Sequence, residues 1–207
     1  RRRFMAAAGG TLVSIGLPGV FVKAMEAENK ALAELIRTDG RPRIPPGQHA
    51  VKALPELGGV KGPGNVPDWR LTIGGKVRKP MTLKFEDLLQ LKQVDLICDV
   101  HCVTGWTLLD SSWQGIPLKD VMEMVEVSKQ AGFVVFEAPG GYSSSIPISE
   151  ARKENVILAH TFMGKKLPLA HGAPLRGLVP DRYFYKSVKW LEELRVVAED
   201  EPGYYET

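Results

Sequence analysis

Residues 94–106 read VDLICDVHCVTGW, and this stretch decides the fold because it combines a strand pattern with the turn that ends it. Apolar residues or cysteine occupy every second position through its first nine residues, which predicts a strand with those side chains on one face. These positions are Val94, Leu96, Cys98, Val100 and Cys102. The following segment, Val103 to Trp106, contains Gly105 and predicts a turn. The sequence therefore predicts that Cys102 lies at the end of a half-buried strand.

Short elements are predicted on either side of this strand. Alternating apolar residues at 69–73 predict a second strand, and Gly74-Gly75 predicts a hairpin-type turn before Val77. Apolar residues at helical spacing over 118–125, directly after Pro117, predict a helix. Further short strands are predicted at 133–137, 175–179 and 194–197. The predicted fold class is α+β, with mixed short strands, few helices and long loops.

The charge balance restricts the class of partner. The 207 residues are 44% hydrophobic and 25% charged, which is typical of a globular chain and not of a disordered one. The formal net charge is +3, but Arg1, Arg2, Arg3 and Lys23 lie among the first 24 residues, which contain no acidic residue. The remaining chain carries 23 basic and 24 acidic residues. No basic stripe is left for nucleic acid, and we expect none as a partner.

The first 24 residues have the layout of an export signal. A basic start with the pair Arg1-Arg2 precedes sixteen uncharged residues, 6–21, and then Lys23-Ala24, where cleavage could occur. This layout predicts a twin-arginine signal over 1–24 and a periplasmic or otherwise exported protein. An ordinary Sec signal and an N-terminal membrane anchor are the alternatives, although a span needs about 20 apolar residues. Twin-arginine export carries folded proteins, commonly loaded with a cofactor.

Residues 25–67 predict a helix followed by an irregular loop. Ala, Leu, Glu and Lys at 27–37 favour a helix. Residues 40–67 hold six glycines and six prolines, too many for a regular element, so we expect a linker or a functional loop. We expect 68–207 to form one domain together with 40–67. The sequence stops abruptly over 202–207, and we expect a longer native chain.

The two cysteines are predicted to be free thiols. On a strand their Cα atoms would lie about 13 Å apart, at roughly 3.3 Å per residue, beyond the ~7 Å reach of a disulfide. A zinc site built from Cys98, His101 and Cys102 is a weaker alternative, because structural zinc needs four ligands and no second Cys or His pair is present. Cys98 lies in an apolar run and is expected to be a small core residue.

Cys102 is the candidate reactive group. A thiolate at the end of a strand could act as a nucleophile or as a ligand for a soft metal. A nucleophile needs a base, and His101, His160 and His171 are the candidates, although His101 would lie on the opposite face of the strand. This pattern alone leaves both a cysteine hydrolase and a redox metal site open.

A second group of candidate functional residues occupies 171–190. It combines a histidine with cations, a serine and aromatic rings, namely His171, Arg176, Arg182, Tyr183, Phe184, Tyr185, Lys186, Ser187, Lys189 and Trp190. This mixture suits a flat, anionic, heteroaromatic ligand, because Arg and Lys bind phosphate and aromatic side chains flank a ring system. A solvent-exposed strand is the alternative, and the glycine spacing of a P-loop is missing.

Six segments of the chain, in sequence order, resemble the sulfite-oxidase-type molybdopterin oxidoreductases. They are RIPPGQ (43–48), WRLTIGG (69–75), HCVTGW (101–106), WQGIPL (113–118), GYS (141–143) and the stretch 171–190. The resemblance implies a sulfite-oxidase-like molybdopterin-binding domain. It also implies that the loop at 40–67 closes over the cofactor.

The resemblance assigns roles to individual residues. Cys102 matches the cysteine whose thiolate binds molybdenum and takes part in catalysis. The implied molybdopterin-binding residues are Gln48, His101, Cys102, His171, Arg176, Phe184, Tyr185, Lys186, Ser187 and Lys189. His160 stands where sulfite oxidases have a tyrosine, and it is expected to donate a proton to a departing oxygen.

The implied activity is oxygen-atom transfer. The sequence has no C-x-x-C-H motif, so electrons are expected from a separate haem protein or cytochrome, with a membrane subunit as a further partner. Residues 103–107 are uncharged, whereas sulfite oxidases carry basic residues after the cysteine. We therefore expect reduction of a sulfoxide or N-oxide, as a small molecule or a sulfoxide-bearing substrate. Sulfite oxidation, a Cys/His hydrolase and a cofactor-free binding module are the alternatives.

Overall fold

The computed structural model describes residues 31, 35–37, 40–57 and 68–206. It divides the chain into two units, 1–45 and 46–207. In the first unit Ile36 forms an antiparallel bridge with Pro42, so the helix predicted over 27–37 is wrong at its C-terminal end. The export signal predicted at 1–24 lies outside the described residues. Within the described part of the chain, no helix combines the length and apolar character needed to cross a bilayer.

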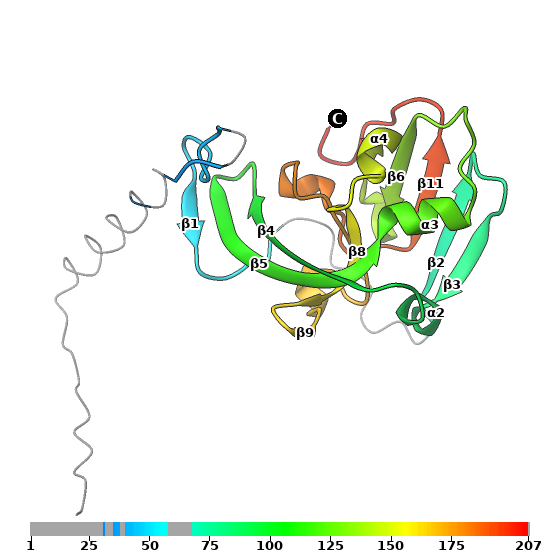
Figure 1. Cartoon of the computed structure of the whole chain (residues 1–207), viewed down its shortest axis with the longest axis horizontal. Helices are drawn as coiled ribbons and strands as arrows, with labels where there is room; N and C mark the ends of the chain where they lie inside the picture. The colour runs from blue at the N-terminus through cyan, green and yellow to red at the C-terminus, as the bar shows by residue number, and fades with distance from the viewer. Residues whose placement is uncertain (1–30, 32–34, 38–39, 58–67, 207) are drawn as a thin grey trace, which may run out of the picture. The chain divides into compact units, whose positions relative to one another are not determined.

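The larger sheet of the second unit is built around one long, curved strand, β5 (Figure 1). Its six strands are β1 (His49–Val51), β4 (Val94–His101), β5 (Trp106–Pro117), β8 (Ile157–Phe162), β9 (Lys165–Lys166) and β10 (Arg176–Leu178). β5 pairs with β4 and β8 in antiparallel fashion and with β1 in parallel. β8 in turn pairs with β9 and β10. This arrangement brings the end of β4 and the start of β10 into the same sheet.

The second sheet has five strands in the order β3-β2-β11-β6-β7. They are β2 (Arg70–Gly75), β3 (Met81–Lys84), β6 (Phe133–Glu137), β7 (Ser143–Pro147) and β11 (Glu193–Val197). Only the pair formed by β2 and β11 is parallel. Alternate residues of β2 and β11 are buried, as expected of strands with one face on a core.

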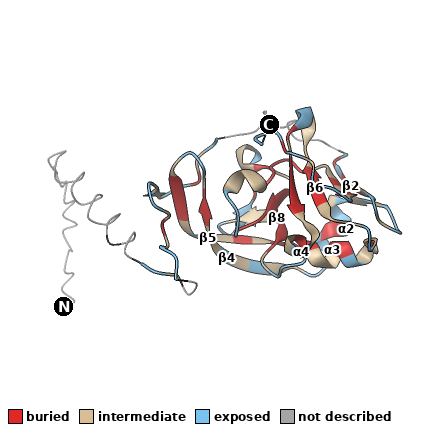
Figure 2. Ribbon diagram, turned by 90° about the horizontal axis from the view of Figure 1, so that it is seen from above, coloured by how far each residue is buried: buried red, intermediate tan, exposed pale blue. Residues whose placement is uncertain are grey.

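Helices are short and few among the described residues. They are α2 (Phe85–Leu89), α3 (Leu118–Met124), α4 (Ile148–Ala151) and the 3-10 turns η1 (Pro139–Gly141), η2 (Leu169–His171) and η3 (Phe184–Lys186). α3 crosses the second sheet, and its Val121 and Met122 share one buried cluster with residues of β2, β6 and β11 (Figure 2). A second buried cluster lies on the larger sheet and includes Val100, Trp113 and Leu178. The predicted α+β class is confirmed.

The side chains of β4, and of Cys102 directly after it, point to the side predicted from the sequence. Val94, Leu96, Cys98, Val100 and Cys102 all pack against the cluster on the larger sheet. The register of β4 on β5 shifts after Cys98, and the extra residue falls on β5. A bulge of this kind leaves the alternation of the opposite strand intact.

Two predictions about turns and loops are corrected by pairing with distant strands. Gly74 and Gly75 do not form a two-residue turn, because they pair with Arg195 and Val196 of β11 and the chain turns over 76–80 instead. The glycine- and proline-rich segment 40–67 contains a regular element, β1, which pairs with β5. Neither pairing can be deduced from local sequence.

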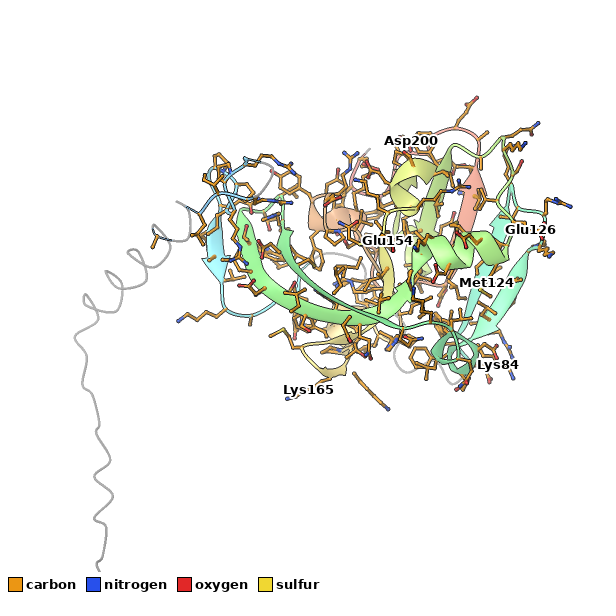
Figure 3. All side chains as sticks on the ribbon, viewed as in Figure 1. Lys84, Met124, Glu126, Glu154, Lys165 and Asp200 are labelled. Atoms are coloured by element: carbon orange, nitrogen blue, oxygen red, sulfur yellow. The ribbon has the colours of Figure 1, made fainter. Side chains whose placement is uncertain are left out.

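Charged side chains lie at the periphery of the second unit (Figure 3). The Glu126 carboxylate forms an ion pair with Lys79 Nζ at 2.5 Å, and Glu154 forms one with Lys119. Pairs of this kind are screened by water and contribute little to stability.

Gly115 is a position where the fold leaves no room for a side chain. A Cβ built there would lie 2.1 Å from the carbonyl oxygen of Leu158 on β8. We therefore expect Gly115→Ala to destabilise the protein by about 2 kcal/mol or more, since the neighbouring strand must shift. Gly74→Ala is the matched control, because nothing lies within 4 Å of its Cβ position. Equal midpoints for the two variants in urea unfolding would contradict this prediction.

Candidate active site

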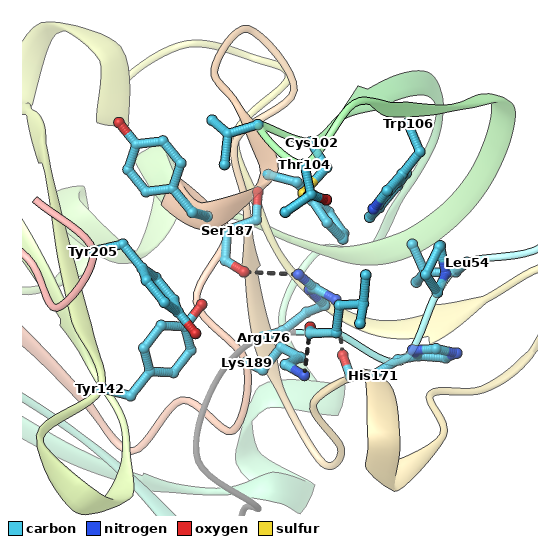
Figure 4. Close-up of a pocket in the computed structure, with 15 residues that line it drawn as sticks. Leu54, Cys102, Thr104, Trp106, Tyr142, His171, Arg176, Ser187, Lys189 and Tyr205 are labelled. Carbon is cyan, nitrogen blue, oxygen red and sulfur yellow. Dashed lines mark hydrogen bonds between the residues drawn. The ribbon is translucent and has the colours of Figure 1, made fainter. Parts of the chain in front are cut away.

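A cavity of about 340 Å³ opens beside Cys102 (Figure 4). Its wall is formed by five separate parts of the second unit, namely 54–57, 102–106, Tyr142, the stretch 171–189 and Tyr205. A volume of this size is in the range of sites for small molecules and cofactors. The two groups of residues singled out in the sequence therefore meet at one site.

Cys102 lies where β4 ends and the chain reverses. Its backbone N–H donates to the Trp106 carbonyl at 2.9 Å, and Gly105 N–H donates to the Cys102 carbonyl at 3.1 Å. This tight turn, in which Gly105 has φ 92°, places the thiol on the cavity wall. The Sγ accepts a hydrogen bond from Thr104 Oγ1 at 3.1 Å.

Hydrogen bonds from Gln48, linked through Thr107 to His101, hold this turn in place. Gln48 Nε2 donates to the Cys102 carbonyl at 3.0 Å, and its Oε1 accepts from Thr107 Oγ1 at 2.5 Å. The same hydroxyl bonds to His101 Nδ1 at 2.9 Å. Gln48 and His101 are not among the cavity-lining residues. They hold the backbone that carries Cys102.

Arg176 is a buried cation on the cavity wall. Its side chain is almost fully buried, with a relative exposure of 1%. Its guanidinium donates only to carbonyl oxygens, those of His171 at 2.8 Å, Ser187 at 2.7 Å and Gly177 at 3.3 Å. Burial lowers the pKa of Arg176 to about 10, and in the described part of the chain no carboxylate pairs with it. A buried charge without a counter-ion is costly, so an anion bound in the cavity would stabilise Arg176.

Aromatic rings surround the Arg176 guanidinium. Its Cζ lies 4.3 Å from the centre of the Phe184 ring and 5.4 Å from that of Trp113. Cation–π contacts of this kind stabilise the charge in part but do not neutralise it. They also hold the guanidinium plane in one orientation.

Lys189 adds a second cation to the same wall. Its Nζ donates to the carbonyls of Leu57 and Ala170, both at 3.2 Å. Burial, followed by the charge of Arg176, lowers the pKa of Lys189 to about 8. A Cβ at Gly172 would lie 2.9 Å from Lys189 Cα and 3.2 Å from Arg176 Cβ, so only glycine lets these segments approach. An anion in the cavity would hold Lys189 in its charged form.

Three further residues of the stretch 171–189 line the cavity. The pKa of His171 is lowered, chiefly by burial and then by Arg176, which favours the neutral ring. Ser187 Oγ accepts a hydrogen bond from Val179 N–H at 2.9 Å and fixes the chain there. Tyr185 also lines the cavity, whereas its neighbour Lys186 does not. Lys186 Nζ instead donates to the Ser145 carbonyl at 2.8 Å and pairs with Glu206.

His160 is not brought to the cavity. It is the extra residue of a bulge in β8, since Gln114 pairs with Thr161 and Gly115 with Ala159. Its Nε2 bonds to Gln93 Oε1 at 2.8 Å, and its ring packs edge-on against Phe85. A bulge redirects the side chain of its extra residue, which sequence spacing cannot reveal. The pairing of His160 with Cys102 that a cysteine hydrolase could use is therefore absent from this geometry, and His160 does not line the cavity where a departing oxygen would lie.

Several cavity-lining residues were not named as site candidates from the sequence, among them Leu54, Trp106, Tyr142 and Tyr205. The Trp106 indole N–H is buried and finds no hydrogen-bond acceptor among the residues that the structure describes. Trp106 and Tyr142 each belong to a segment that carried the family resemblance, and that was a usable signal. Leu54 and Tyr205 come from a loop and a terminal segment with no local signal.

The alternative chemistries find less support in this geometry. Both cysteines are free, as predicted. Over the residues that the structure describes, no group of three or more His, Cys, Asp or Glu could hold a metal ion, so the zinc alternative lacks a ligand set. No histidine hydrogen-bonds to Cys102 Sγ, whose one partner there is Thr104. A cysteine hydrolase would need such a pair.

Comparison with known proteins identifies relatives along most of the chain. Residues 59–205 match the family described as the oxidoreductase molybdopterin binding domain. The uncharacterized oxidoreductase YuiH of Bacillus subtilis (strain 168) is 37% identical over 172 residues, which cover 82% of this chain and 87% of YuiH. The protein-methionine-sulfoxide reductase catalytic subunit MsrP of Xanthomonas axonopodis pv. citri (strain 306) is 32% identical over 145 residues. This match covers 62% of this chain and 45% of MsrP, so the chain spans less than half of that relative.

A solved structure shares the fold. The sulfane dehydrogenase SoxCD from Paracoccus pantotrophus superposes with a TM-score of 0.61 at 19% sequence identity, covering 94% of this chain and 57% of the SoxCD chain. The family match, the identity to YuiH and the shared fold agree. The chain belongs to the oxidoreductase molybdopterin binding domain family and is a sulfite-oxidase-type molybdopterin oxidoreductase.

Proposed function

We propose that Cys102 is the molybdenum ligand in the cavity and that the protein catalyses oxygen-atom transfer, reducing a sulfoxide or an N-oxide-type substrate. The observation that carries this proposal is Arg176, a buried cation with carbonyl partners only, on the same wall as a free thiol. A soft thiolate suits a soft, redox-active metal, and a buried guanidinium suits a phosphate. Molybdopterin that carries molybdenum contains both the soft metal and a phosphate.

The donor set of the cavity fits this group. Arg176 and Lys189 would hold its phosphate, and the orphaned indole N–H of Trp106 could donate to one of its heteroatoms. Phe184, Tyr185, His171 and Ser187 would flank the ring system. Gln48 and His101 act one step away, because they fix the turn that carries Cys102. Lys186 is assigned a supporting role, because its Nζ forms an ion pair with the Glu206 carboxylate and the residue does not line the cavity.

The loop between Gln48 and Leu57 has a covering role in this proposal. Leu54, Pro55 and Leu57 line the cavity with apolar side chains, and the Leu57 carbonyl accepts from Lys189. Apolar walls exclude water and strengthen the electrostatic interactions within. We propose that 40–67 and 68–207 form one catalytic domain on this basis.

The chemistry of the bound group would be a two-electron exchange of an oxygen atom with a substrate lone pair. The chain's own residues decide which substrate enters. Val103 and Thr104 beside Cys102 are uncharged and exposed, whereas Arg176 and Lys189 are buried deeper and committed to carbonyls. In this proposal Arg176 and Lys189 are occupied by the phosphate of the cofactor, so the substrate meets the uncharged residues Val103 and Thr104, which favours a neutral sulfoxide or N-oxide over the sulfite dianion. The similarity to MsrP, named as a methionine-sulfoxide reductase, supports the same direction.

The proposed cellular setting is export to the periplasm, with a separate electron donor. The basic and then uncharged residues of 1–24 support twin-arginine export of the loaded enzyme to the periplasm. The sequence has no C-x-x-C-H motif, which supports a separate haem protein or cytochrome as the electron donor, together with a membrane subunit.

Metal analysis of protein produced in a host that makes molybdopterin tests this proposal. We expect close to one molybdenum per chain and no stoichiometric zinc. With reduced viologen as electron donor, we expect turnover of methyl phenyl sulfoxide or trimethylamine N-oxide and little oxidation of sulfite with an acceptor dye. A protein without molybdenum contradicts the cofactor assignment. A loaded protein that oxidises sulfite and reduces neither oxide contradicts the assigned direction.

A further inference from the structure

The cavity needs a hydrogen-bond donor for the oxygen that leaves the substrate, and His160 does not reach it. Most donors on the cavity wall are already committed. Thr104 Oγ1 donates to Cys102 Sγ, and Lys189 Nζ donates to two carbonyls. Arg176 donates to three carbonyls around it. The hydroxyl of Tyr142 differs from these, since no described residue forms a hydrogen bond with it.

Tyr142 is also held in a fixed position. Its relative exposure is 3%, and it follows Gly140 and Gly141, whose φ values of 73° and 79° turn the chain into β7. The Tyr142 ring packs edge-on against Tyr204 and Tyr205, with centroid distances of 6.1 and 5.8 Å. Figure 4 shows the Tyr142 side chain pointing into the cavity from the side opposite Trp106. A donor fixed in advance stabilises developing charge without a cost of reorganisation.

The electrostatic surroundings keep this hydroxyl protonated. Burial raises the pKa of Tyr142 to about 12, and the charge of Cys102 adds to that rise, while Arg176 opposes it. At neutral pH the side chain is therefore a donor of one hydrogen bond.

We propose that the Tyr142 hydroxyl is a catalytic hydrogen-bond donor that binds the oxygen of the sulfoxide or N-oxide substrate in the Cys102 cavity. This assignment rests on the proposed function. Reduction of a sulfoxide takes up two electrons and two protons and yields a thioether and water. The sulfur–oxygen bond breaks and sulfur keeps the electron pair. The two electrons that the oxygen takes up come from the proposed haem protein or cytochrome, and the two protons come from solvent water. Tyr142 keeps its own proton and stabilises the negative charge that grows on the oxygen.

Tyr142→Phe tests this role because it removes the hydroxyl and keeps the ring. We expect turnover of methyl phenyl sulfoxide to fall by about 100-fold, the size of effect seen when one donor to a developing oxyanion is lost. We expect molybdenum content and thermal unfolding to match those of the wild type. The non-reducible analogue methyl phenyl sulfone should bind about 3- to 10-fold more weakly in calorimetry, the value of one neutral hydrogen bond.

Tyr204→Phe is the matched control. Tyr204 packs on the same ring but is 50% exposed and does not line the cavity, so its variant should keep wild-type turnover and sulfone binding. Wild-type turnover and sulfone binding in Tyr142→Phe would overturn the Tyr142 assignment alone. Loss of molybdenum in that variant would also overturn it, by showing that Tyr142 binds the cofactor. A loaded wild type that reduces no sulfoxide or N-oxide contradicts the proposed function itself.

Discussion

Cys102→Ser abolishes turnover and leaves the fold intact: this is the expected result with the largest effect. A serine oxygen is hard and protonated at neutral pH, so it replaces a soft thiolate ligand poorly. Cys102 is only partly buried and lies in a turn held by backbone hydrogen bonds. The change in the free energy of unfolding should therefore stay below about 1 kcal/mol. Activity assays, metal analysis and urea unfolding of the variant measure its turnover, its molybdenum content and its free energy of unfolding.

Cys98→Ser is the matched control for this experiment. Cys98 lies four residues earlier on β4, and burial raises the pKa of its thiol to about 12, so it is an inert core residue. Its variant should lose about 1 kcal/mol of stability by burying a hydroxyl, yet keep molybdenum and turnover. Full activity in Cys102→Ser, or loss of metal in Cys98→Ser, would refute the choice of ligand.

The second large effect is expected at Arg176. Arg176→Met keeps an unbranched apolar stem close in length to the methylene part of arginine and removes the buried charge that faces the cavity. A charge-assisted hydrogen bond contributes about 1.5–3 kcal/mol, so molybdopterin affinity should fall by about 10- to 100-fold. The carbonyls of His171 and Ser187 also lose their donor, and some loss of stability accompanies the change. Molybdenum and pterin per folded chain are the quantities to measure.

Two further variants separate charge from folding. Arg176→Lys keeps the charge without the planar fork, and an intermediate cofactor content is expected. Arg182→Met removes a cation of the same segment that pairs with Glu150 on the surface and does not line the cavity. That variant should bind the cofactor like the wild type. Unchanged cofactor content in Arg176→Met would show that the phosphate lies elsewhere.

The local parts of this protein could be predicted from the sequence. The alternation from Val94 to Cys102 fixed the face of β4, because successive residues of a strand point to opposite sides. The helix after Pro117 and the strand at 133–137 have the predicted bounds to within one residue. Cys102 was recognised as the end of a strand for the same local reason. Periodicity and turn residues act over a few positions, so these elements need no distant partner.

Pairings between distant segments could not be predicted. The turn expected at Gly74-Gly75 became strand because β11, about 120 residues later, pairs with it. The loop at 40–67 contributes β1 only because β5 offers a free edge. His160 does not line the cavity, because it is the extra residue of a bulge in β8, and that bulge depends on how β8 pairs with β5.

The sequence by itself determined the residue chemistry of the protein: a free thiol after a strand and a later segment rich in cations and aromatic rings. Tertiary structure alone decided which of these groups share a cavity. It brought Cys102, Arg176 and Lys189 to one wall, added Tyr142 and Leu54, and removed His160 and Lys186. The physical reason is that side-chain type is local, whereas proximity depends on strand register, bulges and the close approach allowed at Gly172.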